Sequence, residues 1–364
     1  MTRVIALEEA FLHPRLWDLF PADLQKKYSV LKGRLTDVGP DRIKLMDAAG
    51  IDMQVLSLVQ PGIQIIERPD LAVAVSREVN DWLGEVVRTY PDRFAGFAAL
   101  PTQSPEAAAA ELERTVTQLG LKGALINGHT HGRYLDDEAY SVLFRKAEEL
   151  DVPIYIHPTD PPQVITDTYY GAYAQPLVTG WGWPVETGTH LLRIICSGVF
   201  DRHPRLKIIV GHMGELLPFC LTRLNVALTV GNWLMAAQET NQEKRGAYNG
   251  MQKNMNHYMR ENVFVTSSGV FDQPVFDCAR AMLGIDNLMF SVDDPFQDNF
   301  EAMAFLKAAG LTPEDREKFS HGNAERLLKL TPQAETRRSG DSWAAFKARS
   351  KSRAGRALMS LLVK

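Results

Sequence analysis

Cysteine is scarce in this 364-residue sequence, which contains only Cys196, Cys220 and Cys278. Three scattered cysteines are too few for a disulfide framework and lack the spacing of a zinc finger. Long apolar runs are also missing, because no stretch reaches the roughly 18 residues of a membrane-spanning helix. Residues 1–9 lack the apolar core of a signal peptide. We therefore expect a protein of the reducing cytoplasm without a transmembrane segment.

The sequence has no large excess of charge of one sign, because its formal net charge is −4. The charge is nevertheless uneven. Residues 337–364 hold eight Lys or Arg and one acidic residue, which leaves 32 basic and 43 acidic residues in the remainder. An acidic body argues against nucleic acid as the main partner. We expect residues 331–364 to form a basic C-terminal extension outside the folded domain.

A glycine-rich phosphate-binding turn, which a doubly wound sheet would place after an early strand, is missing as well. The sequence instead alternates short β-type apolar runs with helical patterns. The eight runs cover residues 4–8, 53–59, 94–100, 123–127, 153–157, 207–211, 263–267 and 288–293. Eight such units predict an α/β fold of the (β/α)8 TIM-barrel type over residues 1–330. Residues 12–40, 129–137 and 159–184 are then long βα-loop insertions on the catalytic face.

Polar side chains stand at the ends of most of these runs. The run at 207–210 stops at Gly211, and His212 and Glu215 follow at once. Other runs end in the same way, at Glu8 and Glu9, Asn127, His157, Ser267 and Ser268, and Asp293 and Asp294. Because side chains alternate along a strand, only one residue of each adjacent pair can point into the barrel mouth. Glu8, His157 and Asp293 supply oxygen and nitrogen ligands suited to Zn, Mn, Fe(II) or Mg.

Each of these residues also has a purely structural interpretation. Glu8 could form a salt bridge at the rim, His157 could bond a backbone carbonyl, and Asp293 could cap the next helix. Asp294 fits a helix cap or the surface better than a metal site. The coincidence of several such residues on one barrel favours the metal site. His190 is expected to pack or to support the site. Four histidines are expected at the surface: His13, His203, His257 and His321.

Several segments resemble the metal-dependent non-oxidative decarboxylases of the amidohydrolase superfamily. They are residues 7–11 (Leu-Glu-Glu-Ala-Phe), 155–158 (Tyr-Ile-His-Pro), 201–204, 211–215 and 293–296. Within that group the sequence is similar to the decarboxylases of 5-carboxyvanillate, 2,3-dihydroxybenzoate and γ-resorcylate. Segments 126–136 and 185–193 most resemble the 5-carboxyvanillate branch. The resemblance covers about residues 1–330 and implies the same (β/α)8 barrel.

The resemblance implies that Glu8, His157 and Asp293 bind one divalent metal ion, which is Mn, Zn or Mg. Many superfamily members have a further histidine ligand where this sequence has Ala10. Water would fill that position here. The residue after the ligand aspartate is commonly aromatic in the family, whereas here it is Asp294. These departures leave the reaction class intact and bear mainly on the substrate.

For catalysis the resemblance assigns His212 as a catalytic histidine and Glu215 as its partner carboxylate. Arg223 matches an arginine that reaches the substrate carboxylate across a subunit interface. This match implies a homodimer or homotetramer with a shared active site. Asn127, at the end of the fourth run, is expected to bind the substrate. Phe296, where the 5-carboxyvanillate enzymes have tyrosine, is expected to do the same.

The implied activity is decarboxylation of an ortho-hydroxy aromatic carboxylic acid such as 5-carboxyvanillate or a dihydroxybenzoate. A free aryl carbanion is too unstable to form, so the ring carbon that bears the carboxylate is protonated before CO2 leaves. The resemblance assigns this proton to Asp293. Two alternatives stay open: a metal-dependent hydrolase (lactonase or amidase) on the same barrel, and a non-catalytic barrel scaffold. The lack of a lysine at any strand end disfavours the first, and the intact set of ligands disfavours the second.

Overall fold

The centre of the molecule is a set of short parallel strands. The structure is a computed structural model that describes residues 2–228, 234, 237–238 and 251–331. Its strands are β1 (Ile5–Phe11), β2 (Met53–Leu58), β3 (Phe94–Gly96), β4 (Ala98–Ala99), β5 (Ala124–Asn127), β6 (Ile154–His157), β7 (Ile208–Val210), β8 (Val263–Thr266) and β9 (Leu288–Met289). They pair in the orders β1-β2-β3 and β4-β5-β6-β7-β8-β9, and every pair is parallel. This sequential parallel order is the one that a (β/α)8 barrel requires.

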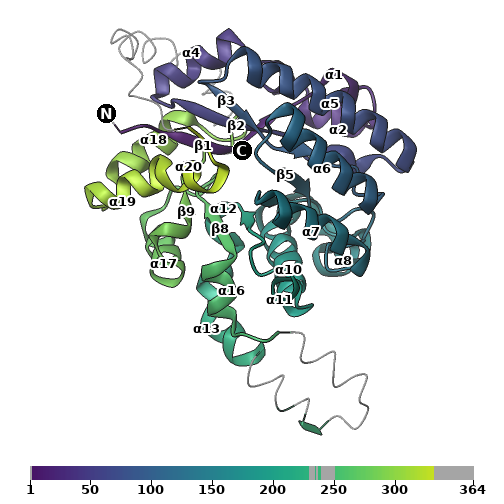
Figure 1. Ribbon diagram of the computed structural model, residues 1–364, viewed down its shortest axis with the longest axis vertical. Helices are drawn as coiled ribbons and strands as arrows, with labels where there is room; N and C mark the ends of the chain where they lie inside the picture. Colours follow the sequence, from purple (N-terminus) through teal and green to yellow (C-terminus); the bar gives the residue numbers. More distant parts are fainter. Residues whose placement is uncertain (1, 229–233, 235–236, 239–250, 332–364) are drawn as a thin grey trace.

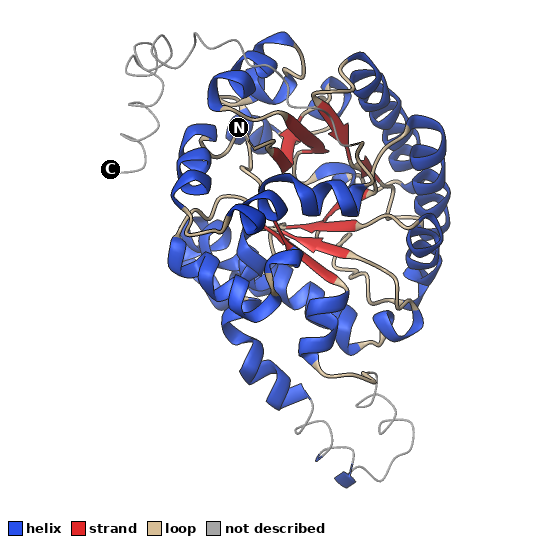
Figure 2. Ribbon diagram, turned by 60° about the vertical axis from the view of Figure 1, so that its left-hand side comes forward, coloured by secondary structure: helices blue, strands red, loops and turns tan. Residues whose placement is uncertain are grey.

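Two contacts join these sheets into one barrel-like arrangement. Phe97 lies between β3 and β4, and its N–H donates to the Leu56 carbonyl at 2.9 Å, so β3 and β4 are parts of one predicted strand. The Leu7 N–H of β1 donates to the carbonyl of Phe290, the residue after β9, at 3.3 Å. The first and last strands therefore meet. Helices surround the strands on the outside (Figure 2), as predicted for an α/β barrel.

Helices follow the strands along the chain (Figure 1). Those of the described residues are α1 (Pro14–Trp17), α2 (Ala22–Tyr28), α3 (Lys32–Thr36), α4 (Pro40–Ala49), η1 (Gly62–Ile65), α5 (Pro69–Thr89), α6 (Pro105–Leu119), η2 (Glu138–Tyr140), α7 (Ser141–Leu150), α8 (Gln163–Ile165), η3 (Thr166–Tyr170), η4 (Gly171–Tyr173), α9 (Ala174–Leu177), η5 (Val178–Gly182), α10 (Trp183–Cys196), α11 (Val199–Arg202), α12 (His212–Glu215), α13 (Leu217–Val226), α16 (Met255–Glu261), α17 (Gln273–Leu283), η7 (Ile285–Asn287), α18 (Asn299–Ala308), α19 (Pro313–Glu317), η8 (Lys318–Gly322) and α20 (Asn323–Leu328). The predicted insertions 12–40 and 159–184 are thus largely helical. No helix in the described ranges is long and apolar enough to cross a membrane.

The barrel interior is apolar at one end and polar at the other. Side chains from alternate strand positions form a small internal core: Ile5, Leu7, Met53, Val55, Ala95, Phe97, Leu125, Tyr155, Ile209, Phe264 and Met289. Ala324, Leu328 and Leu330 pack against this core from α20 and the residues after it. Further along the same strands the inward positions become polar. The carboxyl ends of the strands therefore carry the candidate site, as in other barrels of this type.

A bulge in β1 decides where Glu8 points. The register with β2 shifts between Ala6 and Glu9, and Glu8 has a φ of 64°. Simple alternation from the inward-facing Leu7 would turn Glu8 toward the helices. The bulge turns it into the barrel instead, which is a common use of bulges beside active sites. Glu9 then takes the outward direction.

The eighth predicted strand is shorter than expected. The sequence pattern extends over 288–293, whereas β9 ends at Met289. The backbone beyond β9 bonds to other partners, because the Phe290 N–H donates to the Phe319 carbonyl and the Val292 N–H donates to the Glu9 carboxylate, both at 2.9 Å. The predicted extension at 331–364 lies outside the described residues except for Thr331.

Candidate metal centre

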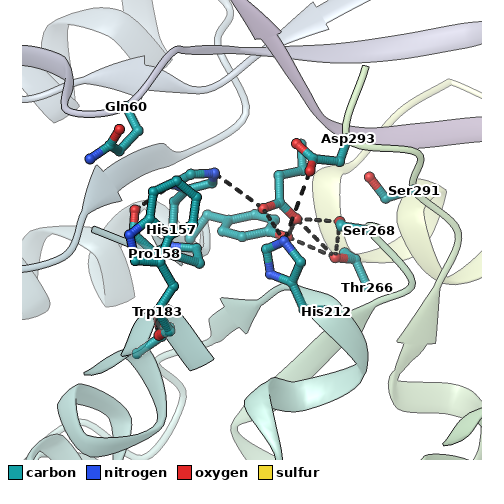
Figure 3. A network of polar contacts seen from close by, with 12 residues as sticks. Gln60, His157, Pro158, Trp183, His212, Thr266, Ser268, Ser291 and Asp293 are labelled. Atoms are coloured by element: carbon teal, nitrogen blue, oxygen red, sulfur yellow. Dashed lines mark hydrogen bonds and ion pairs between the residues drawn. The ribbon is translucent and has the colours of Figure 1, made fainter. Parts of the chain in front are cut away.

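Glu8, His157 and Asp293 come together at the carboxyl ends of the strands. Each offers one ligand atom, and these atoms lie within 4.8 Å of one another. Glu8 is only 1% exposed, whereas His157 and Asp293 are partly open to solvent. Figure 3 shows the side chains of His157, His212 and Asp293 turned toward one shared space. The structure therefore assembles the three residues that the sequence predicted as ligands.

The hydrogen bond of His157 to its neighbour fixes which nitrogen is free. Its Nδ1 lies 2.8 Å from the Pro158 carbonyl oxygen and donates to it. The lone pair of Nε2 then faces Glu8 Oε1 at 3.4 Å. Burial lowers the pKa of His157, although the Glu8 carboxylate opposes this effect, so the ring is neutral. Two lone pairs that face each other repel, and a cation between them would remove the repulsion.

The two oxygens of Glu8 have different surroundings. Oε2 accepts hydrogen bonds from the hydroxyls of Tyr155 and Ser268, and the Thr266 hydroxyl lies 3.3 Å away. Figure 3 shows Thr266 and Ser268 side by side next to this carboxylate. Oε1 is buried and has no hydrogen-bond partner among the described residues. A buried carboxylate oxygen without a partner is costly. The residues present thus fit a single divalent cation, because the unpartnered oxygen faces the lone pair of a neutral imidazole and a second carboxylate.

His212 and Glu215 form a tight pair beside this cluster. His212 Nδ1 lies 2.8 Å from Glu215 Oε1, while its Nε2 lies 4.0 Å from both Glu8 Oε1 and Asp293 Oδ2. The turn that carries the pair, α12, has left-handed φ angles of 50° at His212 and 51° at Glu215. Such angles are rare outside glycine and are characteristic of functional sites. The structure therefore brings together the predicted catalytic histidine and its carboxylate.

The charges of this cluster are strongly coupled. Burial lowers the pKa of His212, but the carboxylates of Glu215, Glu8 and Asp293 outweigh it and raise the pKa to about 10. Burial, and next the Glu8 carboxylate, raise the pKa of Asp293 well above its usual value. Burial also raises the pKa of Glu215. A cation bound at Glu8 and Asp293 would offset the negative charge of the carboxylates. It would therefore oppose the part of these pKa shifts that the carboxylates cause.

Asp294 does not lie at the surface, and this part of the prediction was wrong. It is 2% exposed and pairs with the guanidinium groups of Arg34 and Arg42. The Asp294 N–H also donates to Glu9 Oε2 at 3.0 Å. The reason is tertiary, because Arg34 and Arg42 come from α3 and α4, far away in the sequence. The turn that presents Asp293 is thus held from behind by a buried network of charges.

Two predicted surface histidines are buried. His13 caps α1 through its Nδ1, which accepts from the Arg15 N–H at 3.2 Å, and its ring packs edge-on against Trp82. His203 is 7% exposed and lies 3.5 Å from a carboxylate oxygen of Glu148. Both predictions failed because partners from distant segments shield these rings.

The predicted substrate residues lie at different distances from the cluster. Asn127 is buried and pairs in register with His157 on the neighbouring strand. Phe296 follows Asp293 closely and its ring packs edge-on against Tyr28, with centroids 6.0 Å apart. The Tyr28 hydroxyl donates to Gln60 Oε1 at 2.9 Å. Burial, with the Asp160 and Asp293 carboxylates, raises the pKa of Tyr28, so the helix α2 of the first insertion approaches the site.

Arg223 is not brought into the site of its own chain. It lies exposed on α13, near Phe219, whose side chain is 85% exposed. No carboxylate of the described residues lies within ion-pair distance of its guanidinium group. This position agrees with the expectation of a role across a subunit interface, which stays a prediction.

Sequence analysis missed Tyr155 and Thr266, which contact Glu8. Both could have been found from strand alternation, because Tyr155 lies two residues before His157 on β6, and Thr266 lies two residues after the inward-facing Phe264 on β8. Residues two apart on a strand share one face. The Tyr155 and Thr266 hydroxyls were therefore predictable as inward-facing groups from the positions of His157 and Phe264.

Comparison with known proteins identifies the family of the chain. The family profile described as "Amidohydrolase" matches residues 13–330. The gamma-resorcylate decarboxylase of a Rhizobium species is 38% identical over 337 residues, which cover 90% of this chain and 98% of that protein.

Solved structures give the same picture. A crystal structure of 2,6-dihydroxybenzoate decarboxylase in complex with 2,6-dihydroxybenzoate superposes with a TM-score of 0.80, at 37% identity, and covers 91% of this chain and 99% of that one. The 5-carboxyvanillate decarboxylase of Novosphingobium aromaticivorans, crystallised with manganese and 4-hydroxy-3-methoxy-5-nitrobenzoic acid, gives a TM-score of 0.82 at 34% identity and covers 90% and 96% of the two chains. The chain therefore belongs to the amidohydrolase family, in the branch that contains the gamma-resorcylate and 5-carboxyvanillate decarboxylases.

Proposed function

We propose that this protein is a metal-dependent decarboxylase of ortho-hydroxy aromatic carboxylic acids. The observation that carries the proposal is the buried Glu8 Oε1, which has no hydrogen-bond partner among the described residues and lies 3.4 Å from His157 Nε2, beside the Asp293 carboxylate. Relatives that span nearly the whole chain are decarboxylases of dihydroxybenzoate or 5-carboxyvanillate, and one of them was crystallised with manganese. These relatives favour decarboxylation over the hydrolase and scaffold alternatives.

Glu8, His157 and Asp293 would hold the divalent ion, which is Mn, Zn or Mg. When bound, such an ion supplies a Lewis acid that stabilises negative charge on the ortho oxygen of the substrate. Asp293 would move the proton. Its carboxylate would accept a proton from the substrate hydroxyl and pass it to the ring carbon that bears the substrate carboxylate.

Loss of CO2 completes the reaction. The bond between the ring carbon and the carboxylate breaks, its electron pair restores the aromatic ring, and water returns a proton to the ortho oxygen. His212 would bind or polarise the substrate, since its Nε2 faces the same space as Asp293 and its Nδ1 is held by Glu215. Asn127 and Phe296 would line the substrate site.

The wider context of the enzyme is also proposed. Arg223, exposed on α13 beside Phe219, would bind the substrate carboxylate of a neighbouring subunit in a homodimer or homotetramer. Three unpaired cysteines are consistent with action in the cytoplasm. Residues 1–330 would form the catalytic barrel and residues 331–364 a basic extension.

The deciding experiment measures CO2 release and metal content on the same purified sample. The panel contains gamma-resorcylate, 2,3-dihydroxybenzoate and 5-carboxyvanillate, with benzoate as the control that lacks an ortho hydroxyl. We expect release from at least one hydroxy acid, none from benzoate, and about one divalent ion per chain. Hydrolysis of lactones or amides without CO2 release would point to the hydrolase. A sample that neither binds metal nor turns over any acid would point to the scaffold.

A further inference from the structure

Three hydroxyl groups converge on one oxygen of Glu8. Thr266 is the last residue of β8, Ser268 lies in the turn two residues beyond it, and Tyr155 comes from β6. All three side chains are fully buried. Tyr155 and Ser268 donate directly to Glu8 Oε2, and the Thr266 hydroxyl lies 3.3 Å from it, 2.7 Å from the Tyr155 hydroxyl and 2.8 Å from the Ser268 hydroxyl.

The hydroxyl protons of the three residues determine which oxygen of Glu8 is left free. Each hydroxyl carries one proton. Tyr155 and Ser268 use theirs on Oε2, so the proton of Thr266 is shared among Oε2 and the two neighbouring hydroxyl oxygens. Oε2 thus has its acceptor sites occupied by protein. Oε1 of the same carboxylate has no donor among the described residues and faces His157.

We propose that Tyr155, Thr266 and Ser268 are positioning residues that make Glu8 a ligand through Oε1 alone. A carboxylate can otherwise bind a metal through one oxygen or through both. Here rotation of the carboxylate toward a two-oxygen mode would break at least two charge-assisted hydrogen bonds in a buried site, which are the strong kind. The inference rests on the proposed metal site, because it describes how one of its ligands is presented.

The one-oxygen mode has a consequence for the choice of metal. Ca²⁺ takes six to eight oxygen ligands and readily accepts two oxygens from one carboxylate, whereas Mg²⁺ requires near-octahedral geometry with fewer protein ligands. A Glu8 restricted to Oε1 supplies one oxygen instead of two, which disfavours Ca²⁺ relative to ions that need fewer oxygen ligands. It also keeps coordination positions open for water and for the substrate oxygen, in addition to the one left by Ala10. The hydroxyl cluster therefore selects against Ca²⁺ and for the smaller ions.

A purely structural role makes a different prediction. If the hydroxyls only satisfy a buried carboxylate, their removal would lower stability and weaken all metals by a similar factor. If they restrict Glu8 to one oxygen, their removal would weaken Mn²⁺ binding while Ca²⁺ binding changes less. The ratio of the two dissociation constants separates these cases, because it is insensitive to a general loss of stability.

The test uses the full chain, stripped of metal, with equilibrium binding of Mn²⁺ and of Ca²⁺ measured by competition with a chromophoric chelator. The variants are Tyr155→Phe and Ser268→Ala. The matched controls are Tyr140→Phe and Ser76→Ala, which remove buried hydroxyls that bond the Thr102 and Ala99 carbonyls. We expect each variant to weaken Mn²⁺ about 10–100-fold, which is typical for groups that orient a ligand, and to lower the Ca²⁺/Mn²⁺ dissociation-constant ratio about tenfold. The controls should leave the ratio unchanged.

Two substitutions of Thr266 test the role of its hydroxyl group directly. Thr266→Ser keeps the hydroxyl and should keep the wild-type ratio, whereas Thr266→Val should lower it. Equal losses for both ions in Tyr155→Phe and Ser268→Ala, or an unchanged Mn²⁺ affinity, would overturn the inference while leaving the metal site standing. A wild-type protein that binds none of Mn²⁺, Zn²⁺ and Mg²⁺ would overturn the proposed function itself, so the two failures are distinct.

Discussion

Glu8 and Glu9 are neighbours on one strand, yet their surroundings differ in kind. Both side chains are buried. Glu9 has partners on both oxygens: the Val292 N–H at 2.9 Å reaches Oε1, and the Asp294 N–H at 3.0 Å reaches Oε2. Glu8 has partners on Oε2 only, and its Oε1 has none among the described residues. Both oxygens of Glu9 therefore have hydrogen-bond donors without any ligand, whereas one oxygen of Glu8 does not.

A structural carboxylate and a functional one can be distinguished by the hydrogen-bond partners of their oxygens. Burial, and then the Asp294 carboxylate, raise the pKa of Glu9 to about 8 although Glu9 has a donor on each oxygen, so neither burial nor a shifted pKa identifies a functional carboxylate. The distinguishing feature of Glu8 is an oxygen, Oε1, that has no hydrogen-bond donor among the described residues and faces a second acceptor, His157 Nε2. Glu9 bonds the backbone N–H groups on either side of Asp293 and so holds this turn in place, whereas Glu8 would bind the metal ion together with Asp293. The two residues thus serve one site from opposite sides of β1.

The sharpest test of this comparison replaces Glu8. Glu8→Gln should reduce Mn²⁺ affinity by more than the roughly 100-fold seen for groups that only orient a ligand, and CO2 release should become undetectable. The amide N–H of the new side chain can donate to His157 Nε2, so the metal-free protein should keep its thermal midpoint or gain. Isothermal titration and calorimetry on metal-free protein measure both. Unchanged Mn²⁺ binding would remove the distinction between the two glutamates.

Asp293→Asn tests the residue that both glutamates serve. An amide cannot carry the proton to the ring, so kcat should fall by about 10²–10⁴, the range typical of a lost acid–base group. KM should change little, because the substrate is held mainly by other groups. Steady-state kinetics at saturating Mn²⁺ measure the two constants separately. Normal turnover in this variant would rule out the proton-transfer role.

Arg42→Met tests the bracing side of β1. Arg42 bonds the Asp294 carboxylate at 3.0 Å, Gln54 Oε1 at 2.7 Å and the Ala10 carbonyl at 2.9 Å. Removing one partner of a buried pair costs about 3–5 kcal/mol, and the remaining Arg34 should keep the loss near the lower end. Urea denaturation of metal-free protein measures the change. The control Lys44→Met, at the exposed pair with Asp41, should have little effect.

Glu9→Gln should have a smaller effect than these changes. The new amide group would face a backbone N–H, of Val292 or of Asp294, and two donors cannot bond each other. One buried N–H is left unsatisfied, which costs about 1–3 kcal/mol of stability. Mn²⁺ affinity should stay close to that of the wild type. A loss of metal binding as large as that of Glu8→Gln would contradict the assignment of Glu9 as a structural residue. The same denaturation and titration experiments would reveal it.

Sequence reasoning identified the fold and the three candidate ligands for a clear reason. The alternation of apolar runs with helical patterns is local, and Glu8, His157 and Asp293 stand at the ends of those runs. The direction of Glu8 was not predictable in the same way. It depends on the bulge in β1, which arises from the register with β2 and not from residues near Glu8 alone.

The buried network behind Asp293 illustrates the same limit. Asp294 looks like a cap or surface residue in the sequence, because nothing near it is basic. Arg34 and Arg42 reach it across about 250 positions of the chain. Strand alternation, in contrast, would have identified Tyr155 and Thr266. Local periodicity therefore predicts which residues share a face, and only the folded chain shows which charges meet behind it.

His190 is a third buried polar residue, and it also has one ring nitrogen without a hydrogen-bond partner among the described residues. Its Nε2 accepts from the Leu135 N–H at 2.9 Å, so its Nδ1 carries the proton and has no partner among the described residues. This unpartnered atom is a donor with no lone pair, unlike Glu8 Oε1. It therefore marks a buried neutral ring and not a metal ligand.

Burial, followed by the charges of His129 and Arg193, lowers the pKa of His190 to about 3, from 6.5. Between pH 3 and 6.5 the unfolded chain binds a proton at this residue and the folded chain does not. Its contribution to stability is therefore complete above pH 6.5 and is lost as the pH falls, by at most about 1.4 kcal/mol per pH unit. His190→Gln can keep an acceptor for the Leu135 N–H but cannot titrate. Urea denaturation of both metal-free proteins between pH 6.5 and 5 should show a shallower loss in the variant, and equal slopes would mean that the His190 ring becomes protonated inside the fold.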